Sequence, residues 1–130
     1  MTKVMVFGTF DIIHPGHIHM FKEAKQYGDY LVIAVARDQT VCDIKGKTPK
    51  YNENIRLQNV LELHLADKVR LGCLEDKYQA IREEDPDIIA LGYDQKAFVD
   101  NLALVIRPDA KIVRLQPYLP EIYKSSKMIK

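Results

Sequence analysis

The sequence predicts an α/β fold, in which a Rossmann-like, doubly wound parallel sheet of about five strands forms a single domain over residues 1–130. Three observations lead to this prediction. Strand-like apolar runs alternate along the chain with segments of helical spacing. The run Asp29–Ala36 lacks the polar alternation of a half-exposed strand, which is typical of strands covered by helices on both faces. Polar clusters far apart in the sequence each follow directly after such a run.

The chain begins with an apolar run, Lys3–Phe7, that predicts a short buried strand. A helix is expected to follow from Pro15 to Tyr27, because proline suits the first turn of a helix and Gly28 suits its end. Apolar residues recur at every third position of this segment, which gives the helix a narrow inward stripe. The stripe consists of Ile18, Phe21 and Ala24.

The middle of the chain predicts a second strand, a polar loop and a second helix. Asp29–Ala36 is a continuous apolar run and is predicted to be a buried strand. Asp43–Asn52 contains a glycine, a proline and three lysines, which is typical of a surface loop. Glu53–His64 then has helical spacing of its apolar residues.

The remaining chain continues the alternation of strands and helices. We expect strands at Lys68–Leu71, Asp87–Leu91 and Lys111–Leu115, and helices at Lys77–Glu84, at Gln95–Ile106 and in the tail from Ser125.

Composition narrows the classes of partner. The chain is 47% apolar and 28% charged with a net charge of +1, so nothing indicates binding to nucleic acid through excess basic charge. No apolar run approaches the ~20 residues that span a bilayer, and no secretory pattern precedes the first strand. Cys42 and Cys73 lack metal-binding or redox spacing, so we expect free thiols. A cytoplasmic protein without a membrane or nucleic-acid partner is the expectation.

Three polar clusters are expected to meet at one edge of the sheet. Gly8–Asp11, Arg37 with Asp38, and Gly92–Gln95 each follow a predicted buried strand. Parallel strands end at the same edge, and open α/β sheets bind their ligands there. This edge is therefore the candidate site.

The segment Gly8–His17 (GTFDIIHPGH) is the most informative part of this edge. It places a hydroxyl, a carboxylate and two imidazoles where a strand ends and a helix begins, and the amino end of a helix favours anions. His14 and His17 alone could be zinc ligands or a solvated cap, but zinc requires three or four ligands. We favour imidazoles that donate hydrogen bonds to a phosphate chain, with Gly16 allowing its close approach.

This decapeptide resembles the signature of the cytidylyltransferase-like nucleotidyltransferases, whose H-x-G-H element also occurs in variant form in class I aminoacyl-tRNA synthetases. Nearly the whole chain shares the resemblance, because further segments follow in the order of the family. These segments are Ala36–Asp38, Ile44–Lys47, Asn54–Arg56, Gly92–Asp94 and Lys124–Lys127.

The resemblance implies transfer of a nucleoside monophosphate from a nucleoside triphosphate, accompanied by Mg²⁺, to a phosphorylated acceptor with release of pyrophosphate. The acceptor phosphate is already ionised, so the enzyme has to supply positioning and charge stabilisation rather than a general base. His17 would stabilise the α-phosphate and His14 the phosphate chain. Lys45 would close over the triphosphate, although a lysine-rich loop can also be ordinary solvated surface.

Further residues receive binding roles from the resemblance. The nucleotide would be bound, in addition to both histidines, by Thr9, Phe10, Gly92, Asp94, Ser125 and Ser126. The acceptor would be bound by Asp11, Asp38 and Arg56. Two of these assignments have plain alternatives, since Arg56 could be an ordinary surface arginine and the two serines could be helix caps.

Short segments bear on the substrate. Glycerol-3-phosphate cytidylyltransferases carry Arg-Thr-Glu-Gly-Ile before the closing motif and Gly-Asp-Asp-Trp earlier, whereas this chain has Leu119–Tyr123 (LPEIY) and Gly92–Gln95 (GYDQ). Ala36–Val41 (ARDQTV), the following Lys-Gly and GYDQ are similar to archaeal-type FAD synthetases, which adenylylate FMN. ATP and FMN are therefore the expected substrates.

Three alternatives and one expectation on assembly accompany this interpretation. The chain could use CTP and glycerol-3-phosphate or a similar phosphorylated alcohol, or it could be a non-catalytic nucleotide-binding domain on the same fold. An RNA-binding remnant of the synthetase class would need a basic surface that the composition lacks. The family often forms homodimers, so a homodimer is expected.

Overall fold

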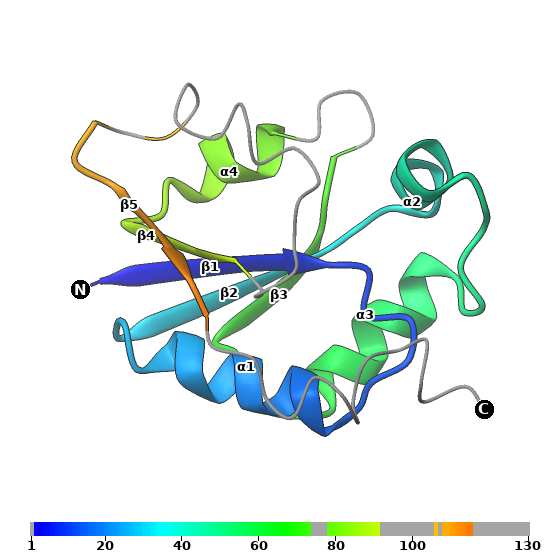
Figure 1. Cartoon of the computed structure of the whole chain (residues 1–130), viewed down its shortest axis with the longest axis horizontal. Coiled ribbons are helices and arrows are strands. Elements are labelled where there is room, and N and C mark those ends of the chain that lie inside the picture. Colours follow the sequence, from blue (N-terminus) through cyan, green and yellow to red (C-terminus); the bar gives the residue numbers. More distant parts are fainter. Residues whose placement is uncertain (1, 74–77, 92–105, 107, 116–130) are drawn as a thin grey trace.

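Five parallel strands form the sheet on which the rest of the chain is built (Figure 1). The computed structural model describes residues 2–73, 78–91, 106 and 108–115. The strands are β1 (Lys3–Gly8), β2 (Tyr30–Val35), β3 (Lys68–Leu71), β4 (Ile88–Leu91) and β5 (Lys111–Arg114), in the spatial order β3-β2-β1-β4-β5. All four neighbouring pairs are parallel. The predicted α/β class and the number of strands are confirmed.

The strand order fixes where a ligand site can form. From β1 the chain moves outward through β2 to β3, and it then returns to the other side of β1 to form β4 and β5. The strand order therefore reverses beside β1, and such a reversal creates the binding crevice of open α/β sheets at the carboxyl edge. The turn after β1 lies at this reversal.

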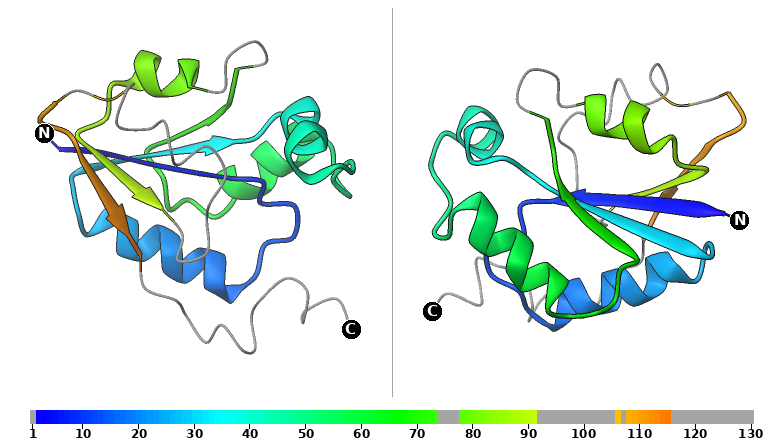
Figure 2. Two further views of the ribbon diagram at one scale, coloured as in Figure 1. Left: turned by 45° about the horizontal axis from the view of Figure 1, so that its top comes forward. Right: turned by 180° about the vertical axis from the view of Figure 1, so that it is seen from behind.

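Helices cover both faces of the sheet (Figure 2). The helices α1 (Pro15–Lys25) and α3 (Glu53–Leu61) lie on one face, and α4 (Gln79–Glu84) lies on the other. Alternate residues of the strands supply the two cores, so β1 gives Val4 and Val6 to the α1 side and Met5 and Phe7 to the α4 side. This two-sided burial explains the absence of polar alternation in β1, β2 and β4.

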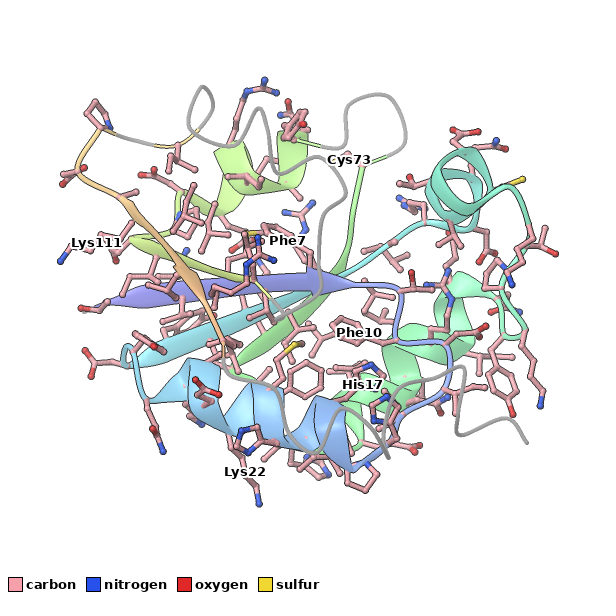
Figure 3. All side chains as sticks on the ribbon, viewed as in Figure 1. Phe7, Phe10, His17, Lys22, Cys73 and Lys111 are labelled. Atoms are coloured by element: carbon pink, nitrogen blue, oxygen red, sulfur yellow. The ribbon has the colours of Figure 1, made fainter. Side chains whose placement is uncertain are left out.

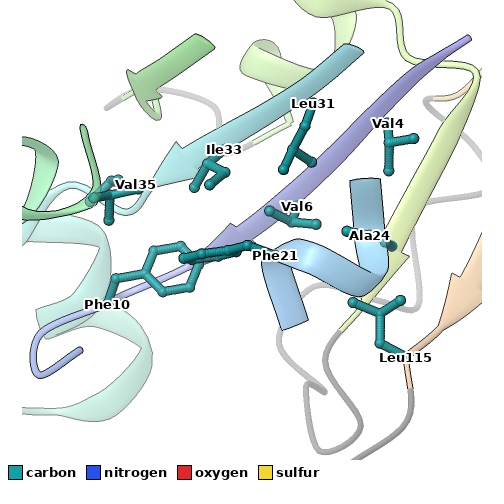
Figure 4. Packing of buried hydrophobic residues seen from close by; sticks show 11 residues of the cluster. Val4, Val6, Phe10, Phe21, Ala24, Leu31, Ile33, Val35 and Leu115 are labelled. Atoms are coloured by element: carbon teal, nitrogen blue, oxygen red, sulfur yellow. The ribbon is translucent and has the colours of Figure 1, made fainter. Parts of the chain in front are cut away.

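The larger core lies beneath α1 and α3 (Figure 4). Phe21 of α1 is completely buried, and the ring of Phe10, from the turn after β1, packs edge-on against it with centroids 5.1 Å apart. The candidate site and the hydrophobic core are thus joined by one aromatic pair. The strand residues of this core are Val4, Val6, Leu31, Ile33, Val35 and Ala90, and Leu115 directly after β5 joins them.

The structure corrects several predicted boundaries. A helix, α2 (Asp38–Lys45), occupies a segment for which no helix was predicted, and the polar loop begins only at Gly46 rather than at Asp43. Gly46 ends α2 in the left-handed conformation at φ 75°, which glycine adopts at little cost. The helices predicted to reach Tyr27 and His64 end at Lys25 and Leu61.

Other predictions have mixed outcomes. The helix predicted from Lys77 begins at Gln79, and Cys42 and Cys73 are free thiols as expected. The helices predicted at Gln95–Ile106 and from Ser125 lie outside the described residues, apart from Ile106. Within the described part of the chain, no helix has both the length and the apolar character that crossing a bilayer requires.

A buried carboxylate ties α4 to the sheet. The side chain of Glu84 is only 4% exposed, and its carboxylate lies 2.7 Å from Lys68 Nζ, 3.1 Å from Arg70 Nη1 and 3.5 Å from Lys3 Nζ. Burial alone would raise the pKa of Glu84, but hydrogen bonds from Lys68 and Arg70 outweigh burial and hold this pKa below its usual value. One side chain thereby links β1, β3 and α4.

The ion cluster leads to a stability prediction. Replacement Glu84→Gln should lower the free energy of unfolding at neutral pH by about 2–3 kcal/mol, because three cations lose a buried charged acceptor. Glu83→Gln is the matched control, since Glu83 pairs with Arg70 from an exposed position and its loss should cost less. Urea denaturation of both variants measures the difference.

The same cluster predicts a dependence on pH. Because the pKa of Glu84 is lowered in the folded state, its contribution is complete above the unfolded value of about 4.3 and is lost as the pH falls through the folded value. The gap between the wild type and Glu84→Gln should therefore close in acid. A gap that persists unchanged to low pH would contradict this role of the charge.

Candidate functional site

The turn that follows β1 is shaped by an aromatic ring packed against a glycine. Phe10 has a left-handed backbone at φ 52°, which is unusual for a large residue, and its side chain is buried. A Cβ atom on Gly8 would lie 2.6 Å from Phe10 Cζ, so any larger residue at position 8 would displace the ring. Gly8 therefore provides the space in which Phe10 is buried.

Phe10 supports a histidine as well as the core (Figure 3). Its ring meets the ring of His17 edge-on, with centroids 5.4 Å apart and an interplanar angle of 84°. Because Phe10 is wedged against Gly8 and Phe21, it fixes one side of the His17 imidazole. The predicted contact of Phe10 with a nucleotide stays a prediction, and what the structure describes is this packing.

His14 and His17 cap the first turn of α1 in a reciprocal manner. His14 is the N-cap residue, and its Nδ1 accepts a hydrogen bond from the backbone N–H of Gly16 at 3.1 Å. His17 Nδ1 in turn accepts from the backbone N–H of His14 at 3.4 Å. The two imidazoles stack with centroids 4.0 Å apart. The two histidines therefore form a capping box.

The capping bonds determine the protonation of both rings. A ring nitrogen that accepts a hydrogen bond carries no proton, so each imidazole is neutral and holds its proton on Nε2. Each ring then offers an Nε2–H group as a donor. Two such donors at the positive end of a helix suit an anionic ligand such as a phosphate.

Burial reinforces the neutral state of His14. Removal from water lowers the pKa of His14 below its usual range, because the charged imidazolium loses solvation. The positive end of the α1 dipole disfavours an imidazolium in the same direction. His14 is therefore a neutral donor near pH 7 and not a fixed positive charge.

Asp11 holds the chain segment that precedes α3. Its Oδ2 accepts from the backbone N–H of Lys50 at 2.6 Å, and its Oδ1 accepts from the backbone N–H of Tyr51 at 2.8 Å. Both carboxylate oxygens thus have partners within the protein. Asp11 was predicted to contact the acceptor, and this contact stays a prediction.

Arg56 is completely buried, so the alternative of an ordinary surface arginine is wrong. Its Nη2 donates to Asp38 Oδ1 at 2.7 Å, its Nη1 to the carbonyl oxygen of Thr9 at 2.8 Å, and its Nε to the carbonyl oxygen of Tyr51 at 2.9 Å. The guanidinium connects the segments that follow β1 and β2 with the start of α3. Its predicted contact with the acceptor also stays a prediction.

A second arginine extends this network to β3. Arg37, directly before α2, donates to the carbonyl oxygen of Gly72 at 2.7 Å and to Glu53 Oε2 at 2.8 Å. Glu53 Oε1 accepts from the backbone N–H of Asp38 at 2.9 Å. Neither Arg37 nor Glu53 received a role from the sequence, since their partners lie far away along the chain and no local spacing indicates the contact.

The structure brings together only part of the predicted site. The described residues that meet at the carboxyl edge are Thr9, Phe10, Asp11, His14, His17, Asp38 and Arg56. Lys45 is the last residue of α2, immediately before Gly46. Gly92, Asp94, Ser125 and Ser126 lie outside the described residues. Among the residues that the structure describes, no three His, Cys, Asp or Glu side chains form a group that could hold a metal ion.

Comparison with known proteins identifies the family and the relatives of this chain. A family described as Cytidylyltransferase-like matches residues 5–130. The chain is 42% identical over 137 aligned residues to the FAD synthase of Thermoplasma volcanium, with 100% of this chain and 93% of the relative covered. It is 44% identical to the FAD synthase of Thermoplasma acidophilum, with 97% and 90% covered.

Solved structures share the fold. A protein of Thermoplasma volcanium described as a lipopolysaccharide core biosynthesis protein superimposes with a TM-score of 0.80 at 46% identity, covering 91% of this chain and 98% of that one. The pantoate-beta-alanine ligase of Francisella tularensis superimposes with a TM-score of 0.60 at 14% identity, covering 98% of this chain and 67% of that one. At that identity the likeness concerns the fold alone.

The capped and partly buried ring of His14 predicts an unusual titration. His14 should titrate below the ordinary histidine pKa of about 6.5, because protonation costs solvation and displaces the Gly16 N–H from Nδ1. NMR titration of the imidazole signals measures this midpoint, and the His14→Gln variant identifies the signal.

The sign of the effect on stability follows from the same shift. Below about pH 6.5 the unfolded chain binds a proton at His14 more readily than the folded chain does, so folding stability should fall as the pH drops toward the folded pKa. A midpoint for His14 at or above the ordinary value would contradict the capped neutral ring.

Proposed function

Because the chain belongs to the cytidylyltransferase-like family, we propose that it is an FMN adenylyltransferase that forms FAD from ATP and FMN. The chain is a nucleotidyltransferase. The observation that supports the proposed substrates is the 42–44% identity, over nearly the full chain, to two relatives named FAD synthase. In the proposed reaction an FMN phosphate oxygen attacks the α-phosphorus of ATP, the bond from that phosphorus to the bridging oxygen breaks, and pyrophosphate leaves.

The chemistry of this step explains the composition of the site. The attacking phosphate is already ionised at neutral pH, so no general base is required. The enzyme has to align the two phosphates and stabilise the charge that develops on the α-phosphate and on the leaving pyrophosphate. Neutral imidazoles that donate from Nε2 fit the second task, because they supply hydrogen bonds directed at growing negative charge.

We assign His17 to the α-phosphate and His14 to the phosphate chain. Phe10 holds the His17 ring from one side, and the reciprocal cap fixes both Nδ1 atoms, so neither ring has to reorganise when the charge develops. The backbone of Thr9 and Phe10 and the amino end of α1 complete this phosphate site. Lys45 would add positive charge from the end of α2.

Magnesium enters this proposal as part of the MgATP substrate. Mg²⁺ commonly uses phosphate oxygens and water, with only one or two protein carboxylates. This fits the described residues, where the Asp11 oxygens accept two backbone N–H groups and Asp38 Oδ1 accepts from Arg56. For the other substrate groups we propose that Asp38 and Asp94 accept from hydroxyl groups, and that Gly92, Ser125 and Ser126 contact the nucleotide.

Two wider expectations accompany the proposed activity. A homodimer is expected from the family resemblance and a cytoplasmic location from the composition, and both stay predictions. Size-exclusion chromatography with light scattering measures the first of these directly.

The proposed substrates are tested by an assay with matched pairs. The purified chain with MgATP and FMN should release pyrophosphate and form FAD, whereas CTP in place of ATP, or glycerol-3-phosphate in place of FMN, should give a much lower rate. Pyrophosphate release and chromatographic detection of FAD are measured together. Turnover of CTP with glycerol-3-phosphate, but not of ATP with FMN, would establish the alternative substrates instead.

The role of His17 is tested by comparing its replacement with the replacement of another histidine of α1. His17→Ala should lower kcat by about 10²-fold or more, because one donor to the developing charge is lost. His19→Ala is the matched control, since His19 lies on the same helix, is partly exposed and pairs with Glu23 away from the cap. Circular dichroism verifies that both variants fold. Near-normal turnover by His17→Ala would remove His17 from the proposed mechanism.

A further inference from the structure

Two residues that were expected to bind substrate, Asp11 and Arg56, form hydrogen bonds to the backbone of Tyr51. Its N–H donates to Asp11 Oδ1 at 2.8 Å, and its carbonyl oxygen accepts from Arg56 Nε at 2.9 Å. The preceding N–H, that of Lys50, donates to the other oxygen of Asp11 at 2.6 Å. These bonds join the turn after β1 to the segment that leads into α3.

Arg56 also forms a hydrogen bond to the turn that follows β1. Its Nη1 donates to the carbonyl oxygen of Thr9, the residue before Phe10, and Phe10 supports the His17 ring. The guanidinium has no exposed surface, so it could bind a substrate phosphate only after breaking bonds to Thr9, Tyr51 and Asp38. Such a rupture would cost the buried guanidinium its acceptors and leave the Thr9 and Tyr51 carbonyl oxygens without this donor, which is costly.

We propose that Asp11 and Arg56 are positioning residues. Together they form a strap that fixes the lysine loop to the histidine turn, the segment 9–17 that follows β1. The lysine loop is the segment 46–50, and the strap consists of the Asp11 and Arg56 side chains with the backbone of Lys50 and Tyr51. Neither side chain contacts substrate in this assignment. The inference rests on the proposed function in one respect, namely that Lys45, which directly precedes this segment, acts on the triphosphate.

The geometry of the loop shows what the strap controls. At its start, Gly46 ends α2 with its N–H bonded to the Cys42 carbonyl oxygen at 2.8 Å. At its end, Asp11 binds two successive backbone N–H groups. The loop between these anchors carries Lys47 and follows Lys45. The strap therefore sets the place of the loop relative to His14 and His17, which lie three and six residues after Asp11.

The two possible roles of Asp11, as a positioning residue or as a substrate or metal ligand, predict different hydrogen exchange in the protein without ligands. A positioning carboxylate protects the N–H groups of Lys50 and Tyr51 at all times, whereas a ligating carboxylate matters only when substrate is bound. Hydrogen exchange in the ligand-free chain separates these roles, and it does so whatever the substrate is.

The first experiment uses Asp11→Asn in the full chain. The asparagine keeps the shape but turns an –NH₂ group toward one backbone N–H, so exchange at Lys50 and Tyr51, measured by NMR, should become about fivefold faster or more. Asp67→Asn is the matched control, because Asp67 accepts from the backbone N–H of Leu31 and not from the strap. Unchanged exchange at both positions in Asp11→Asn would overturn the proposal.

The second experiment uses Arg56→Lys with ATP and FMN as substrates. Lysine keeps the charge but cannot reach three acceptors at once, so kcat should fall about tenfold or more while both KM values change by less than about threefold. Exchange at Tyr51 should rise in the free protein as well. A rise confined to the KM of one substrate, with unchanged exchange, would identify a substrate ligand instead.

The two experiments fail in distinguishable ways. If the wild type makes no FAD, the proposed function fails, and the exchange measurements still decide whether the strap exists. If Arg56→Lys does not fold, Asp11→Asn carries the test alone, since Asp11 lies at an exposed part of the strap.

Discussion

A guanidinium without access to water has to find its hydrogen-bond partners inside the protein, and this constraint at Arg56 organises the carboxyl edge of the sheet. Its acceptors are the Thr9 and Tyr51 carbonyl groups and the Asp38 carboxylate, which belong to segments after β1, before α3 and after β2. A buried charge that lost one of these partners would be strongly destabilising. The three segments are therefore held in one arrangement, and the turn that carries the histidines is part of it.

The two faces of the sheet differ in how they relate to the candidate site. On the face of α1 and α3, the core extends through Phe21 and Phe10 to the ring of His17, so close packing reaches the candidate site without interruption. On the face of α4, the buried Glu84 carboxylate gathers cations from β1 and β3. A change in the Glu84 ion cluster should affect stability. A change in the packing of Phe21, Phe10 and His17 should also affect the geometry of the candidate site.

The sequence predicted those features whose causes are local. The strands β1, β2 and β4 follow from uninterrupted apolar runs. The histidine pair lies three residues apart at a helix start, so its contact is encoded in the spacing. Helix α2 was not predicted, because its last three residues, Asp43–Lys45, were assigned to the loop that Gly46 and Pro49 indicated. The burial of Arg56 was also out of reach, since its bond to Thr9 spans 47 positions and only the folded sheet brings the two together.

Neutral histidines place a demand on the rest of the site. Because the Nδ1 atoms of His14 and His17 accept backbone N–H groups, the rings supply directed donors but no positive charge. A triphosphate carries several negative charges, and hydrogen bonds from neutral rings do not neutralise them. In the proposed reaction the compensating charge would come from the Mg²⁺ of the MgATP substrate and from Lys45 at the end of α2. A site that divides donors and charge between two segments works only if their separation is fixed, and the bonds of Asp11 and Arg56 to Tyr51 connect those two segments.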